Sequence, residues 1–143
     1  METAASGAGH VLSEVWLPGF QKWALIDGQF NLMPVLDDVP LNAVELQQAI
    51  LNRKPFKFID TNGEVSAGRG VYYLFFIKKY LYYFDTKIDS RPGGSATQAK
   101  YGGKTHLMLV PLQAKKPEVF QQQYPIDYAH YTNALKDFYQ PPF

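Results

Sequence analysis

The fold of this chain depends first on one stretch, residues 9–31, which reads GHVLSEVWLPGFQKWALIDGQFN. Residues 11–17 are predicted to form a strand, which the Pro18-Gly19 pair then breaks. Residues 22–26 are predicted to form a second strand, close enough to be its hairpin partner. Residues 30–35 either extend this second strand or form an irregular edge. The stretch therefore predicts an antiparallel hairpin near the start of the chain.

A histidine opens the first predicted strand and an aspartate closes the second. Because side chains alternate along a strand, one face is expected to carry His10, Leu12, Glu14 and Trp16. In an antiparallel hairpin the start of one strand lies beside the end of the other, so His10 is predicted to lie near Asp27. A carboxylate beside an imidazole fixes its tautomer and stabilises its protonated form, as a general base requires. An isolated His–Asp pair is more often a surface hydrogen bond than a catalytic dyad, and the residues alone leave both interpretations open.

The same stretch carries a longer pattern: Gly-His, Glu-Val four residues after the His, a turn, Lys-Trp, an apolar triplet ending in Asp, and Asn four residues later. The matching residues are Gly9-His10, Glu14-Val15, Pro18-Gly19, Lys22-Trp23, Ala24-Leu25-Ile26, Asp27 and Asn31. As a set they resemble the His and Asp strands of the transglutaminase-like superfamily of papain-like thiol enzymes. The helix start PLNAVEL at residues 40–46 also resembles the segment after those strands in bacterial members. The resemblance covers residues 9–52, about a third of the chain.

In that family a cysteine thiolate at the start of a helix attacks a glutamine side chain or another amide. The His acts as base and acid, and the Asp orients the His. The resemblance implies these two roles for His10 and Asp27, with Glu14, Trp23 and Asn31 as supports. By default the three supports are structural, Glu14 as a solvated strand residue and Trp23 as a core residue. The resemblance implies a protein or peptide substrate and no cofactor.

The chain departs from the family at the nucleophile, because it contains no cysteine. Ser6 and Ser13 are poor substitutes: Ser6 lies in a segment expected to be flexible, and Ser13 faces away from His10. We therefore expect no thiol acyl transfer from these residues alone. Three explanations stay open. The 143 residues are a fragment of a longer enzyme, or one of two chains that share a site, or a natural remnant that binds without catalysis. The last alternative is a non-enzymatic binding or assembly module, with a protein partner or a second copy covering the exposed sheet.

Beyond the hairpin, the predicted elements indicate an α+β fold with a mainly antiparallel sheet. An amphipathic helix of about three turns begins near Leu41, with Asn42 as N-cap and Glu45 completing a capping box. Strands are predicted at residues 55–60, 64–67, 71–77, 80–84 and 105–112, a long basic loop at 89–104, and a closing helix at 127–138. Asn62-Gly63 predicts a tight hairpin turn. We expect a single domain over residues 1–143, with a flexible start at 1–8 and a β-rich extension at 53–143.

Composition narrows the remaining function classes. The net charge of +1 provides no field that would attract nucleic acid or an acidic membrane. Three scattered histidines without cysteine do not predict a zinc site. The Gly102-Gly103-Lys104-Thr105 run lacks the first glycine of a phosphate loop and precedes a strand, so no such loop is predicted. No signal peptide or membrane-spanning segment is visible, and the compartment is not indicated.

Overall fold

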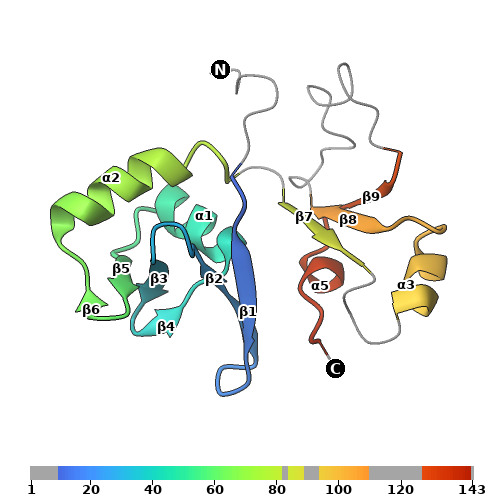
Figure 1. Ribbon diagram of the computed structural model, residues 1–143, viewed down its shortest axis with the longest axis horizontal. Coiled ribbons are helices and arrows are strands. Elements are labelled where there is room, and N and C mark those ends of the chain that lie inside the picture. Colours follow the sequence, from blue (N-terminus) through green and yellow to red (C-terminus); the bar gives the residue numbers. More distant parts are fainter. Residues whose placement is uncertain (1–9, 82–83, 89–93, 110–126, 143) are drawn as a thin grey trace. The chain divides into compact units, whose positions relative to one another are not determined.

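The computed structural model describes residues 10–81, 84–88, 94–109 and 127–142. They fall into two compact units, one ending at Leu81 and the other made of the described residues from 84 onward (Figure 1). The flexible start expected at residues 1–8 lies outside the described residues. Whether the two units make up the single expected domain stays a prediction.

The first unit contains six short strands and two helices. In chain order they are β1 (Ser13–Leu17), β2 (Lys22–Ile26), β3 (Met33–Leu36), β4 (Val39–Pro40), α1 (Ala43–Leu51), β5 (Lys57–Asp60), β6 (Gly63–Glu64) and α2 (Ala67–Ile77). Strands β1 and β2 form a two-stranded sheet, and the other four form a sheet in the order β4-β3-β5-β6. Every strand pair in this unit is antiparallel.

The predicted hairpin is confirmed. Its ladder runs from Ser13 opposite Ile26 to Leu17 opposite Lys22. Asp27 follows directly and forms an isolated bridge with Leu32, so the chain turns back on itself at the end of β2. The hairpin therefore places the segment before β1 beside this second turn.

The helix predicted near Leu41 is α1, and its start is built as expected. The Asn42 side chain accepts a hydrogen bond from the Glu45 amide (2.8 Å), and the Asn42 amide donates to the Glu45 carboxylate (2.9 Å). Lys22 of β2 forms an ion pair with the same carboxylate and donates to the Pro40 carbonyl (2.7 Å). A locally encoded cap thus also anchors the helix to the hairpin.

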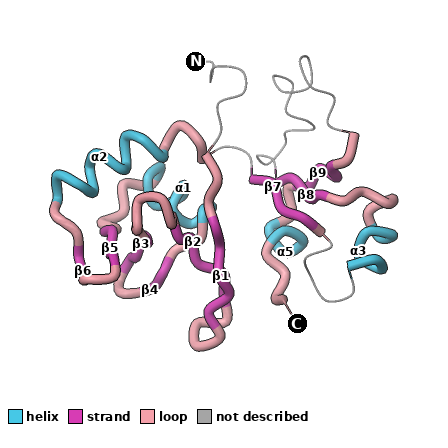
Figure 2. The backbone as a smooth tube through the Cα atoms, in the orientation of Figure 1, coloured by secondary structure: helices cyan, strands magenta, loops and turns pink. Residues whose placement is uncertain are grey.

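The strand predicted at residues 71–77 is wrong, because these residues belong to helix α2 (Figure 2). The Ser66 side chain caps its first turn by accepting from the Arg69 amide. Tyr73 and Ile77 are buried, whereas Val71, Tyr72 and Phe75 on the other side are exposed. Tertiary burial of one helical face outweighs the β-propensity of the aromatic and β-branched residues.

The described residues of the second unit form a three-stranded sheet and two helices. They are β7 (Phe84–Lys87), α3 (Gly94–Lys100), β8 (His106–Leu109), β9 (Ala129–Thr132) and α5 (Leu135–Phe138). The order is β7-β8-β9; β7 and β8 are antiparallel, whereas β8 and β9 are parallel.

Three predictions for this part of the chain need correction. The expected loop at residues 89–104 contains helix α3. The helix expected at 127–138 is reduced to α5, because its first half forms strand β9, which pairs with β8. The strand predicted at 80–84 has only Phe84 as the first residue of β7, with Tyr80 and Leu81 outside any strand. The strand predicted at 105–112 is confirmed as β8, although residues 110–112 lie outside the described residues.

The expected α+β class with mainly antiparallel sheet is confirmed. A helix follows the hairpin and a short one lies near the C-terminus, as predicted, while α2 and α3 are additional. Among the described residues, no helix is long and apolar enough to cross a bilayer.

Candidate functional site

The site begins with the pair that the hairpin was predicted to bring together. Nε2 of His10 lies 2.7 Å from Oδ2 of Asp27, although the residues are 17 positions apart. Because an ionised carboxylate can only accept, Nε2 carries the proton of this hydrogen bond. The remaining ring nitrogen, Nδ1, is then the one that can accept a proton. No hydrogen bond joins Nδ1 to another of the described residues.

The Asp27 carboxylate is completely buried and receives four hydrogen bonds. On Oδ2 the donors are His10 Nε2 and the Tyr73 hydroxyl, the latter at 2.8 Å. On Oδ1 they are the backbone amides of Gln29 at 3.0 Å and Phe30 at 3.2 Å. Since a carboxylate offers about four lone-pair directions, this group is fully satisfied. A buried charge is stable only in such surroundings.

These contacts also determine the charge state of the pair. Burial alone would raise the pKa of Asp27, but the hydrogen bonds from His10, Tyr73 and the Phe30 amide outweigh it and lower the pKa. Burial, together with the nearby Asp27, raises the pKa of the Tyr73 phenol. Asp27 is therefore an anion and Tyr73 a neutral donor at any pH where the protein would work.

Aromatic rings surround the imidazole. The ring centroid of His10 lies 4.9 Å from that of Phe76, 5.9 Å from Tyr80 and 6.1 Å from Phe30. Only 7% of the His10 side chain is exposed. The ring is thus held firmly by its neighbours and is largely withdrawn from solvent.

One further side chain braces this arrangement from outside. Arg69, in the first turns of α2, donates to the Phe30 carbonyl (2.7 Å) and to the Asp60 carboxylate (2.5 Å). It thereby links the turn after β2 to both α2 and β5. The backbone amides that face Asp27 belong to this braced turn.

The three predicted supports have structural positions. The Glu14 carboxylate accepts from the amide of Ala43 (2.7 Å), the first residue of α1, so it joins β1 to the positive end of that helix. Trp23 lies opposite Trp16 in the hairpin, and their rings meet edge to face at 5.8 Å. Asn31 adopts a positive φ of 51° in the turn after Asp27 and donates to the Thr61 hydroxyl (3.2 Å). None of these contacts involves the imidazole.

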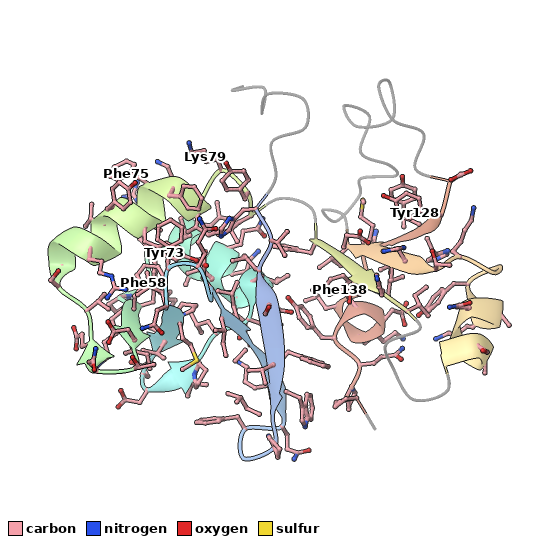
Figure 3. All side chains as sticks on the ribbon, viewed as in Figure 1. Phe58, Tyr73, Phe75, Lys79, Tyr128 and Phe138 are labelled. Atoms are coloured by element: carbon pink, nitrogen blue, oxygen red, sulfur yellow. The ribbon has the colours of Figure 1, made fainter. Side chains whose placement is uncertain are left out.

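Sequence reasoning missed the residues that complete the site from α2. Tyr73 lies on the inner side of this helix with Phe58 nearby, while Phe75 and Lys79 lie on its outer side (Figure 3). A signal was present, because Tyr73, Phe76, Ile77 and Tyr80 recur at helical spacing. The interpretation of this segment as a strand concealed it.

The other two histidines lie in the second unit and have local contacts. Nδ1 of His106 is 3.0 Å from the Thr105 hydroxyl, and the His130 ring lies tilted against Tyr101, with 4.8 Å between the ring centroids. Within the described ranges, no cluster of three acidic or histidine side chains could hold a metal ion. Comparisons of the chain with protein-family models, curated proteins and solved structures give no match.

Proposed function

We propose that His10 and Asp27 are the acid–base half of a transglutaminase-like thiol acyl-transfer site. The substrate would be a glutamine side chain or another amide of a protein or peptide. The observation that carries the proposal is the His10–Asp27 hydrogen bond of 2.7 Å, made to a buried carboxylate whose other lone pairs are all occupied. A carboxylate in a solvated surface pair would need no such set of protein donors, since water would supply its hydrogen bonds.

The chemistry follows from the state of each group. Nδ1 of His10 takes the proton of a cysteine thiol, and the thiolate attacks the amide carbonyl carbon. The protonated imidazole then donates its proton to the departing amine, and the acyl group remains on sulfur until water or another amine takes it. Asp27 keeps the Nε2 proton in place and stabilises the transient positive charge. Because these 143 residues contain no cysteine, the thiol would come from another segment or another chain.

The test is made on the gene product that carries these residues together with the sequence encoded upstream of Met1. It is assayed for ammonia release from glutamine-containing peptides and simple amides. We expect His10→Ala and Asp27→Asn each to lower kcat/KM about 10²- to 10⁴-fold. His130→Ala, the same change at a histidine of the other unit, is expected to leave it unchanged. Activity that survives His10→Ala, or an inactive product whose upstream segment does carry a cysteine, would contradict the proposal.

A non-enzymatic binding module is the second candidate. It is favoured by the small exposed fraction of the imidazole and by the exposed apolar side chains of α2: Val71, Tyr72 and Phe75. In this case association with a protein partner, or with a second copy, would depend on the outer face of α2. Phe75→Glu would then abolish association, whereas His10→Ala would not.

A further inference from the structure

Tyr73 binds the same oxygen atom of Asp27 that His10 binds. Its hydroxyl and Nε2 of His10 bind the same oxygen, Oδ2 of Asp27, at 2.8 and 2.7 Å. The backbone amides of the braced turn bind only the other oxygen. Tyr73 is therefore the one side chain, among the described residues, that shares with His10 the atom on which the imidazole depends.

The position of this hydroxyl is determined by the fold and not by the pair itself. Tyr73 is completely buried in α2 and comes from 46 residues beyond Asp27. Its ring meets Phe58 of β5 edge to face at 5.0 Å and lies 5.2 Å from Phe30. A side chain held on both sides in this way keeps its hydroxyl in place even when the imidazole moves.

We propose that Tyr73 is a positioning residue of the dyad. Its hydroxyl holds Oδ2 where it receives the Nε2 proton, and it takes up part of the negative charge on that oxygen. Asp27 then orients the imidazole firmly without stabilising its protonated form to the full extent of an unshared carboxylate. Such moderation suits a base that must both take up and release a proton.

The effect on the pair can be measured without any activity. The titratable groups that the described residues place around the dyad are Asp27 after β2, Tyr73 in α2 and Tyr80 after it. Replacing Tyr73 by Phe removes only the hydroxyl. With more charge left on Oδ2, the hydrogen bond that Nε2 of His10 donates should become stronger, and the NMR signal of the Nε2 proton should move downfield.

The experiment follows the imidazole nitrogens and their protons in the 143-residue chain by NMR. In Tyr73→Phe the Nε2 signals of His10 should shift, while the ring signals of His106 and His130 stay unchanged. Tyr101→Phe is the matched control, because its hydroxyl is buried without a hydrogen-bond partner among the described residues. It should leave the Nε2 signals of His10 where they are. Unchanged Nε2 signals of His10 in a folded Tyr73→Phe chain would overturn the inference.

If Tyr73→Phe does not fold, the unsubstituted chain gives the answer. The hydroxyl proton of Tyr73 should exchange slowly with water, and rapid exchange would overturn the inference. As an effect on catalysis, the inference rests on the proposed function. In an active gene product, Tyr73→Phe should lower kcat with little change in KM, because the hydroxyl binds Asp27 and not the substrate. The NMR result stands whether or not activity is found, so the two failures can be told apart.

Discussion

At the scale of single residues, the costliest feature of the first unit is the charge on Asp27. A carboxylate withdrawn completely from water loses several kcal/mol of hydration unless donors replace it. Here the replacement comes from a histidine before β1, two amides of the following turn and a tyrosine of α2. Removing any one of these partners leaves part of the negative charge of the buried carboxylate without a hydrogen-bond donor.

The first residue-scale prediction concerns stability in acid. The pKa of Asp27 is lower in the folded chain than its value of about 3.9 in an unfolded chain. Asp27 therefore contributes stability that is fully present above that unfolded value and is lost as the pH falls through the lower folded value. Asp27→Asn should lower the free energy of unfolding at pH 7 and flatten its dependence on pH below about 4.

The measurement is the urea midpoint of unfolding between about pH 2 and pH 6. Asp37→Asn, in the exposed turn between β3 and β4, provides the control and should keep the acid slope of the unsubstituted chain. An unchanged slope in Asp27→Asn would show that Asp27 is not held as a buried anion.

At the scale of elements, the helix predicted from a local capping pattern is confirmed, whereas the helix that depends on long-range contacts was wrongly predicted as a strand. The capping box of α1 involves residues three positions apart, so its sequence pattern and its geometry agree. Helix α2 is rich in residues that favour strands, and the burial of Tyr73 and Ile77 against the rest of the unit, together with the Ser66 cap, stabilises it as a helix. The dyad is completed by Tyr73 of α2, so it depends on an element of the kind that long-range contacts stabilise.

The element-scale prediction uses two glycines. Gly70 is inside α2, and an added Cβ would lie 3.5 Å from Phe58 and 3.9 Å from Val65, which is ordinary contact. Gly70→Ala should therefore stabilise the protein by about 0.5–1 kcal/mol. Gly63 has a φ of +114°, so Gly63→Ala should destabilise it by a similar or larger amount. Both are measured by thermal unfolding.

The two substitutions act as controls for each other, since they add the same methyl group. A Gly70→Ala chain less stable than the unsubstituted one would indicate that this segment is not helical in solution. A stabilising Gly63→Ala would argue against the tight β5–β6 turn.

At the scale of the whole molecule, the described contacts of the dyad all come from residues 10–81. The donors to Asp27, the rings around the imidazole and Arg69 of the braced turn belong to the first compact unit. Nothing in the described second unit is needed to build the pair. The first unit should therefore be able to form the dyad by itself.

This expectation is tested with a chain of residues 9–81. Its NMR spectrum should show dispersed amide signals and the His10 tautomer protonated on Nε2, as in the 143-residue chain. A collapsed spectrum, or loss of the Nε2-protonated tautomer, would show that the site needs the rest of the chain.

The sequence by itself determined the hairpin, the α1 cap and the proximity of His10 to Asp27. Each depends on strand alternation, turn chemistry or a capping pattern within a short stretch, where geometry follows directly from residue order. The resemblance that assigns these residues a role in acyl transfer stays a prediction, which the upstream-extended gene product can test.

Only the tertiary structure decided that α2 is a helix and that Tyr73, Phe76 and Tyr80 complete the surroundings of the dyad. It also decided that residues 129–132 are a strand beside β8 rather than part of a helix. The physical reason is the same in both cases. When a segment's local preference is weak or misleading, the burial it gains against distant residues determines its conformation, and no local pattern reports that gain.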